Sequence, residues 1–113
     1  MFEYGEILLI PIPFTDLSSH KRRPVVVISN DKYNGESENI IVVAMTSNPT
    51  LNAHTFTVNP SELESGTLNR PGQIRADKIY TLAQSIVVKK FGKLKPVVSA
   101  KIRTLVIGLI TRT

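Results

Sequence analysis

The sequence predicts a mainly β fold with short helices and one longer helix near the C-terminus. Short runs of β-branched and apolar residues recur along the chain, and clusters of turn-forming residues separate them. Apolar residues take up helical spacing only after Pro96. With 113 residues, of which 42% are hydrophobic and 20% are charged, the chain can bury a core. We therefore expect a single domain over residues 1–113, built from about six strands.

The first apolar run, Ile7–Phe14, is a predicted strand with an irregular backbone. Pro11 and Pro13 lack the N–H group that a strand donates to its neighbour. We therefore expect this strand to be bulged or to lie at an edge of the sheet. The polar stretch Thr15–Lys21 then predicts a loop.

Two continuous β-branched runs, Pro24–Ile28 and Ile40–Ala44, predict the centre of the sheet. Runs without polar alternation are typical of strands that are covered on both faces. The connection Ser29–Gly35 between them is rich in turn formers and is long enough for a short helical turn.

Further strands are expected in the second half of the chain. Thr55–Val58 alternates polar and apolar residues, as a half-buried strand does. Asn59–Glu62 has the signature of a helix start, with proline at the first helical position. After the turn-forming residues Arg70–Gly72, the stretch Gln73–Asp77 alternates with period two. Ser85–Gly92 predicts the last strand.

The C-terminal segment has the spacing of an amphipathic helix whose first turn begins at Pro96. Because β-branched residues and Gly108 lower its intrinsic helix propensity, packing has to stabilise it. The apolar stripe comprises Val98, Ile102, Leu105 and Leu109, widened by Val106 and Ile110.

Composition narrows the range of functions. The chain has 14 Lys and Arg against 9 Asp and Glu, and this net charge of +5 favours a polyanionic partner such as nucleic acid. The alternative is a charge that serves only to keep a small protein in solution. The lack of cysteine and the presence of only two histidines exclude disulfides, a thiol nucleophile and the usual zinc sites. A magnesium site made of carboxylates alone is still compatible with these counts. No phosphate loop or dinucleotide fingerprint occurs, so we expect no cofactor.

The apolar runs are all far shorter than the roughly 20 residues needed to cross a bilayer. The first run also lacks the pattern of an export signal, because Glu3 and Glu6 flank it and prolines interrupt it. We therefore expect a cytoplasmic protein that makes no membrane contact.

Three polar clusters lie at or near the ends of predicted strands. The first comprises His20, Lys21, Arg22 and Arg23. Such a cationic run can neutralise the phosphates of a nucleic acid, and the alternative is a solvated basic loop. The second is Thr46-Ser47-Asn48. Its hydroxyl groups can hydrogen-bond a phosphate or a base edge, and the alternative is that these residues only form the turn before Pro49.

The third cluster follows from the period-two alternation, which places Gln73, Arg75 and Asp77 on one face of a strand. An Arg and an Asp at this spacing usually form a plain surface ion pair. Beside a phosphate, the Arg can offset developing negative charge and the Asp carboxylate can accept a proton. Because neither group ordinarily titrates near neutral pH, such an enzyme would depend mainly on electrostatic stabilisation.

Four segments, taken in order, resemble a known family over nearly the whole chain. They are Tyr4–Ile7, Arg23–Asp31, Met45–Ser47 and Ile74–Leu82. Their order is similar to that of the MazF/PemK/Kid family of toxin endoribonucleases. The resemblance implies an SH3-like β-barrel of the CcdB/PemK type with a C-terminal amphipathic helix, assembled as a homodimer. It also implies the toxin of a type II toxin–antitoxin system, with a cognate antitoxin protein as its partner.

The activity that the resemblance implies is metal-independent cleavage of single-stranded RNA, such as mRNA, at short specific sequences. The products carry 2′,3′-cyclic phosphate and 5′-hydroxyl ends. MazF-like members use an Arg before Pro and a Thr at a strand end, which match Arg23 and Thr46. Kid-like members use an Arg-x-Asp pair and a histidine of the first loop, which match Arg75, Asp77 and His20.

From this resemblance we hypothesise that Asp77 is the base for the 2′-hydroxyl and that Arg75 donates to the leaving 5′-oxygen. Arg23 and Thr46 would stabilise the phosphorane. The residues expected to contact RNA around this centre are Lys21, Arg22, Ser47, Phe56, Gln73, Lys78 and Tyr80. Among these, the aromatic residues Phe56 and Tyr80 are the candidates for base contact, and for both the alternative is a place in the core.

The chain departs from the family pattern in two places. The first loop, Thr15–Arg22, is short and lacks a Gly/Glu/Gln-rich stretch, which leaves open where His20 lies relative to the RNA. Where many members read Gln-x-Arg-Thr, this chain reads Lys78-Ile79-Tyr80-Thr81, which predicts a changed RNA preference or a changed dimer or antitoxin contact.

Two other functions fit the same fold. The first is a CcdB-like poison of DNA gyrase, which binds rather than cleaves. The second is a non-catalytic barrel that binds nucleic acid, for which the chain's four Phe and three Tyr are few to form a stacking platform.

Overall fold

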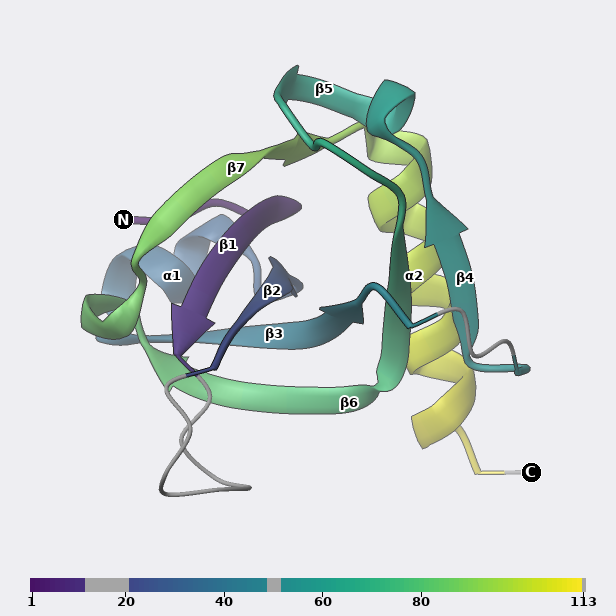
Figure 1. Cartoon of the computed structure of the whole chain (residues 1–113). Helices are drawn as coiled ribbons and strands as arrows, with labels where there is room; N and C mark the ends of the chain where they lie inside the picture. Colours follow the sequence, from purple (N-terminus) through teal and green to yellow (C-terminus); the bar gives the residue numbers. More distant parts are fainter. Residues whose placement is uncertain (12–20, 49–51, 113) are drawn as a thin grey trace.

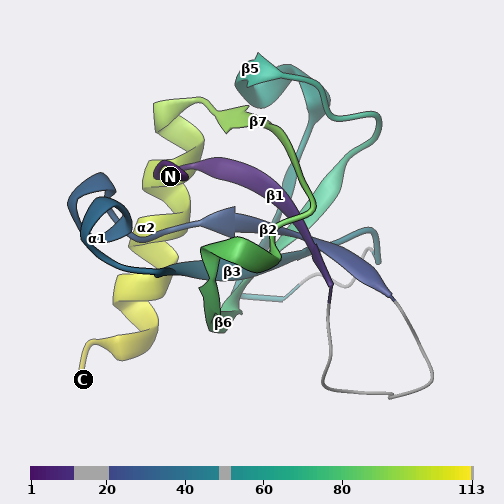
Figure 2. The same cartoon turned by 90° about the vertical axis from the view of Figure 1, so that its left-hand side faces the viewer.

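Seven strands form one antiparallel sheet that curls into a half-barrel, and helix α2 packs along one side of it (Figures 1 and 2). The computed structural model describes residues 1–11, 21–48 and 52–112. The strands are β1 (Glu6–Pro11), β2 (Arg22–Val27), β3 (Asn39–Thr46), β4 (Thr55–Val58), β5 (Leu63–Gly66), β6 (Gly72–Ala83) and β7 (Lys89–Leu94). The other elements are α1 (Asp31–Glu36), α2 (Pro96–Ile110) and the 3₁₀ turns η1 (Pro60–Glu62) and η2 (Gln84–Ile86). Neighbouring strands follow the order β4-β6-β3-β2-β1-β7-β5, which confirms the expected mainly β fold with a C-terminal helix.

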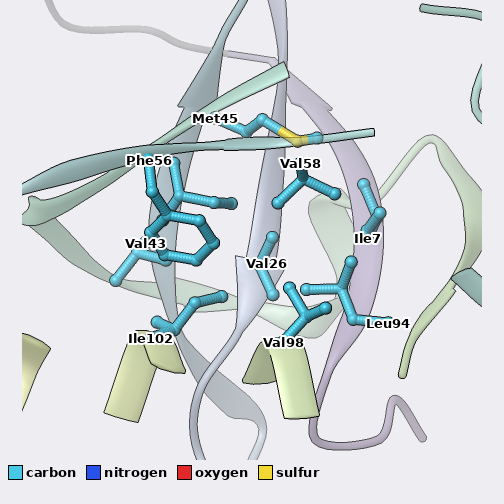
Figure 3. Packing of buried hydrophobic residues seen from close by; sticks show 10 residues of the cluster. Ile7, Val26, Val43, Met45, Phe56, Val58, Leu94, Val98 and Ile102 are labelled. Atoms are coloured by element: carbon cyan, nitrogen blue, oxygen red, sulfur yellow. The ribbon is translucent and has the colours of Figure 1, made fainter. Parts of the chain in front are cut away.

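Both faces of the central strands are buried, as their continuous β-branched runs predict. Successive side chains of β2 and β3 point to opposite faces and enter two hydrophobic clusters. The helix-side cluster comprises Ile7, Val26, Val43, Met45, Phe56, Val58, Ile74, Leu94, Val98 and Ile102 (Figure 3). The opposite cluster comprises Leu8, Ile10, Val25, Val27, Ile40, Val42 and Leu82. The central strands are thus held rigidly from both sides.

Helix α2 is held mainly by its first half. Val98 and Ile102 are buried in the helix-side cluster, and Val106 is partly buried against it. Leu109 and Ile110 of the expected stripe are instead 37% and 73% exposed, because the last turns of the helix run beyond their contact with the sheet (Figure 2). With 15 residues, α2 is the longest helix, and no helix in the described ranges is long and apolar enough to cross a membrane.

Strand β1 is bulged, but it is not an edge strand. It lies between β2 and β7, and its register against β7 shifts between Ile7 and Leu8. Pro11 is the last residue of the strand, where a missing N–H interrupts no later pairing. Of the two expected alternatives, a bulge or an edge position, the bulge is therefore the one that the structure confirms. Pro13 and most of the predicted loop Thr15–Lys21 lie outside the described residues.

The two connections for which the sequence indicates helical structure, one after β2 and one after β4, differ in how well the sequence predicts them. The expected helical turn after β2 is confirmed as α1. The helix start at Asn59 produces only the short turn η1, in which the Glu62 carboxylate accepts a hydrogen bond from the Asn59 N–H at 2.9 Å. Strand β5 was not predicted, because Leu63 is its only apolar residue and the other three positions are exposed.

The last predicted strand, Ser85–Gly92, begins only at Lys89. The preceding residues form η2 because Gln84 is held on several sides. Its Nε2 donates to the Asn34 carbonyl at 2.8 Å, and its Oε1 accepts from the Phe2 N–H at 3.1 Å. These bonds tie the N-terminus and α1 to the turn after β6.

Strand β5 pairs with β7 in an antiparallel manner, and Gly66 lies opposite Gly92. We call the close contact of these two glycines the crossing. Gly66 has a φ of +83°, and a Cβ on either glycine would overlap the backbone of the other strand. Immediately after the crossing, the Thr67 N–H donates to the Phe91 carbonyl at 3.0 Å. This close approach fixes the direction in which residues 67–71 leave the sheet.

We expect Gly66→Ala to lower the free energy of unfolding by about 2–4 kcal/mol, because the substitution adds a left-handed backbone penalty to a backbone overlap. Urea unfolding measures the effect. The matched control is Gly108→Ala on the exposed part of α2, where nothing lies within 4 Å of the added Cβ. This control should raise stability by about 0.5–1 kcal/mol. Equal effects of the two substitutions would contradict the close crossing.

Candidate functional site

The sheet divides in the middle of β2, at Pro24. The Val27 carbonyl accepts a hydrogen bond from the Gly5 N–H on the β1 side, at 2.9 Å. Because backbone groups alternate sides along a strand, the nitrogen of Pro24 faces β3. Proline has no N–H to donate, and the ladder between β2 and β3 accordingly ends at the pair Val25 and Ala44.

Beyond Pro24 the two strand ends take different partners. Arg22 and Arg23 pair with β1, whereas Met45 and Thr46 pair with β6. We call the opening between Arg22–Pro24 and Met45–Ser47 the fork. Its walls are two well-anchored strand ends, so side chains on both walls are positioned by regular backbone rather than by a loop.

Strand β6 bends sharply on the other side of β3 (Figure 1). The neighbouring residues Val43 and Ala44 of β3 pair with Ile79 and Arg75, so residues 76–78 of β6 have no partner in this ladder. A bulge of this kind bends the strand and redirects its side chains. The bend therefore brings Arg75 and the residues after it to the side of the fork.

Two depressions meet at the fork. The large depression, about 350 Å³, lies between the fork and residues 68–72. The small depression, about 250 Å³, lies between the fork and the bend of β6. Arg23, Met45 and Thr46 line both. The large depression is also lined by Arg22, Ser47, Arg70 and Phe91, and the small one by Asn48, Arg75, Lys78 and Tyr80.

The lining of the two depressions is cationic. Five basic side chains contribute to it, namely Arg22, Arg23, Arg70, Arg75 and Lys78. No carboxylate occurs among the described lining residues. Within the described ranges, Arg75 alone of these five forms a salt bridge. Such a concave basic surface attracts anions, and the hydroxyl groups of Thr46 and Ser47 add neutral hydrogen-bonding partners.

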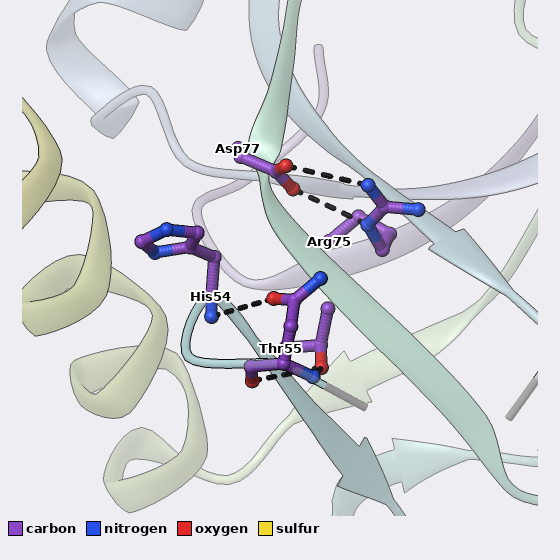
Figure 4. Close-up of polar contacts among 5 residues, drawn as sticks. His54, Thr55, Arg75 and Asp77 are labelled. Atoms are coloured by element: carbon purple, nitrogen blue, oxygen red, sulfur yellow. Dashed lines mark hydrogen bonds and ion pairs between the residues drawn. The ribbon is translucent and has the colours of Figure 1, made fainter. Parts of the chain in front are cut away.

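Arg75 and Asp77 form a two-point ion pair at the bend, as their shared face predicts (Figure 4). Arg75 Nε and Nη2 donate to the two carboxylate oxygens at 3.2 and 3.3 Å. This hydrogen bonding holds the pKa of Asp77 below its ordinary value, although partial burial opposes the shift. Asp77 therefore stays ionised at neutral pH and fixes the orientation of Arg75, which faces the small depression.

His54 is a residue near the site that sequence reasoning missed. Its carbonyl accepts the Ala76 N–H at 3.0 Å, so it anchors the bend, and its side chain lies near the ion pair (Figure 4). The positive charge of the imidazolium form contributes a further, smaller lowering of the pKa of Asp77. The available signal was a histidine directly before the predicted strand at Thr55.

Two residues expected to contact RNA are buried. Phe56 belongs to the helix-side cluster and is 9% exposed, with Lys101 Nζ 4.5 Å from its ring centre. The alternative of a place in the core therefore holds for Phe56, and we do not retain it as a base contact. Gln73 is 8% exposed. Its backbone pairs with Thr46 of the fork, but its side chain bonds to β4, where Nε2 donates to Thr57 Oγ1 at 2.7 Å.

The remaining expected residues are placed as follows. Lys78 and Tyr80 line the small depression, and Lys21 is exposed just before β2. His20 lies outside the described residues. Arg70, which the sequence marked only as part of a turn, joins the lining. Over residues 1–11, 21–48 and 52–112, no three His, Cys, Asp or Glu side chains are grouped as a metal-ligand set.

Comparisons with known proteins add to this geometry. A sequence model of the PemK-like, MazF-like toxins of type II toxin–antitoxin systems matches residues 3–110. Comparison with curated protein sequences finds no match.

Solved structures resemble the whole fold. An endoribonuclease in complex with its cognate antitoxin, from a mycobacterial species, superimposes with a TM-score of 0.80 at 17% identity, over 100% of both chains. A chain of MazE–MazF from Deinococcus radiodurans gives 0.75 at 20% identity, over 98% of this chain and 97% of that one. The Mycobacterium tuberculosis toxin MazF-mt6 gives 0.72 at 17% identity, over 91% and 93%.

We expect Asp77→Asn to lower stability at neutral pH by about 1 kcal/mol or less, because the ion pair is partly exposed. The folded-state pKa is lowered, so the stabilisation is present above the unfolded value of about 3.9 and is lost as the pH falls through the folded value. Urea midpoints of the wild-type chain and the variant should therefore differ at pH 7 and converge in strong acid. Glu64→Gln, at an exposed position of β5, is the control. A difference that persists in acid would contradict the ionic origin.

Proposed function

The chain belongs to the family of PemK-like, MazF-like toxins of type II toxin–antitoxin systems, and on that basis we propose that it is an endoribonuclease acting on single-stranded RNA. The observation that carries this proposal is the convergence of five basic side chains, without a carboxylate in the described lining, on the depressions at the fork. A single RNA strand offers a phosphate to such a surface at every nucleotide. Structurally similar proteins that are endoribonucleases support the same reading.

In the proposed reaction, the 2′-hydroxyl oxygen attacks the adjacent phosphorus and the bond from phosphorus to the 5′-oxygen breaks. The products are a 2′,3′-cyclic phosphate and a 5′-hydroxyl, the latter taking its proton from water. Arg23 and the Thr46 hydroxyl line both depressions, where they would stabilise the negative charge of the phosphorane. The step as proposed uses side chains of this protein together with water as the proton donor to the leaving group.

Arg75 and Asp77 have linked roles in this proposal. Arg75 uses Nε and Nη2 to bind Asp77, which leaves Nη1 for the leaving 5′-oxygen. Asp77 does not line the small depression itself but is held beside it by its ion pair with Arg75. From there it would accept the proton of the 2′-hydroxyl, and its lowered pKa keeps it in the required ionised form. The same lowered pKa makes it a weak base, so the rate enhancement comes mainly from the arginines.

The proposed partners are a cognate antitoxin and a second copy of the chain. The solved relatives include an endoribonuclease with its cognate antitoxin and a MazE–MazF complex. An acidic antitoxin segment would compete with RNA for the basic depressions at the fork. For a homodimer, the exposed apolar side chains of α2, Ile107 and Ile110, offer a surface at 51% and 73% exposure.

The wild-type protein is expected to cut a long single-stranded RNA at discrete positions in excess EDTA, leaving 5′-hydroxyl ends. Arg23→Ala and Arg75→Ala should each reduce the cleavage rate by roughly 10²-fold or more, because each removes a charge that stabilises the transition state. Lys32→Ala on α1, which removes the same charge away from the fork, should cleave like the wild type. Intact RNA, from protein shown to be folded, would instead favour a gyrase poison or a binding-only barrel.

The double variant Ile107→Ser and Ile110→Ser is expected to sediment as a monomer at concentrations where the wild-type chain sediments as a dimer. The reason is the loss of exposed apolar area from α2. Thr104→Ala, at an exposed polar position of the same helix, serves as the control. A monomeric wild-type chain would overturn the dimer, and a dimeric double variant would move the interface elsewhere.

A further inference from the structure

The large depression has a wall that the proposed cleavage step does not use. Arg23 and Thr46 lie where the two depressions meet, whereas Arg70 lines only the large one. Arg70 and its neighbours 68–71 belong to the connection between β5 and β6, which faces the start of β2 across the depression.

The backbone holds this wall in place. Its N-terminal end is fixed where Gly66 crosses Gly92 and where Thr67 donates to the Phe91 carbonyl at 3.0 Å. Its C-terminal end is fixed by Gly72, which pairs with Val58 at the start of β6. A segment anchored at both ends within a few residues presents its side chains in a defined direction.

The lining of the large depression combines basic and apolar side chains. Arg22, Arg23 and Arg70 supply three guanidinium groups, and none of them has a salt-bridge partner within the described ranges. Leu68, Pro71 and Phe91 supply apolar surface beside them. A nucleotide combines the same two properties, because its phosphate is anionic and its base has a flat π-face that packs against apolar side chains.

We propose that the large depression is a subsite for a nucleotide that flanks the scissile phosphate, with Arg70 binding the phosphate of that nucleotide and the apolar wall contacting its base. Its volume of about 350 Å³ falls within the range of roughly 300–1,000 Å³ typical of ligand pockets. This inference rests on the proposed function, since it assumes that the small depression holds the reacting phosphate. It makes Arg70 a residue that determines affinity for the RNA strand rather than the chemical step.

The test measures binding separately from cleavage. The probes are single-stranded RNAs of mixed sequence, uniformly 2′-O-methylated so that the attacking hydroxyl is blocked, in a series from a dinucleotide to an octanucleotide. Affinities of the full chain and of Arg70→Ala are measured over a range of salt concentrations. Lys32→Ala is the charge-matched control away from the fork, and thermal unfolding checks that each variant is folded.

We expect Arg70→Ala to bind the octanucleotide about tenfold more weakly, as loss of a charge-assisted hydrogen bond predicts. Its slope of log affinity against log salt should be shallower by roughly 0.7, which corresponds to one released counterion on a single strand. The difference from the wild type should be smaller for the dinucleotide, because its single phosphate cannot occupy both depressions. Arg70→Lys should restore the salt slope but only part of the affinity, because it keeps the charge and loses the planar fork of donors.

Two outcomes separate this inference from the proposed function. If the wild-type chain cleaves RNA but Arg70→Ala matches it in affinity and salt slope at every length, the subsite is wrong and the endoribonuclease stands. If unmodified RNA stays intact while Arg70→Ala shows the expected losses, the subsite stands as a nucleic-acid contact and the proposed cleavage fails.

Discussion

The missing N–H of Pro24 is the constraint on which the rest of the site depends. Had another residue stood there, its N–H would face β3 and could extend the ladder from Val25 toward Met45. With proline at this position, Arg22 and Arg23 follow β1 while Met45 and Thr46 follow β6. The fork is thus a gap in hydrogen bonding within an otherwise continuous sheet. Its walls remain rigid because the strands beyond it are buried on both faces.

A second irregularity complements the first. Residues 76–78 of β6 do not pair with β3. The C-terminal end of β3 is therefore flanked by the fork on one side and by the bend of β6 on the other. Gathering basic groups in one place costs electrostatic repulsion. Among the described residues, a carboxylate offsets this repulsion only at Arg75, through its ion pair with Asp77. The other arginines of the lining have no salt-bridge partner in the part of the chain that the structure describes, so they can bind an anionic ligand. Part of the repulsion is therefore relieved when that ligand binds.

The sequence predicted most of what depends on local pattern. The β-branched runs identified β2 and β3 as central, and alternation gave the bounds of β4 and the shared face of Arg75 and Asp77. Features set by long-range contact were not predictable. Strand β5 has no apolar alternation because it is a short exposed edge, and η2 forms because Gln84 reaches groups distant in the chain. Arg70 and His54 likewise join the site only through the crossing of β5 with β7 and the bend of β6.

The bend in β6 is fastened through a main-chain atom of His54, its carbonyl oxygen, rather than through its imidazole. Every residue type carries such a carbonyl, so the side chain at position 54 is not what holds the bend. Sequence drift there can therefore exchange a titratable ring for a neutral or acidic group beside Asp77 while the bend is kept. The charge around the ion pair and the backbone bend that positions it can therefore evolve independently. Relatives of this chain can change the electrostatics of the site while the bend of β6 is kept.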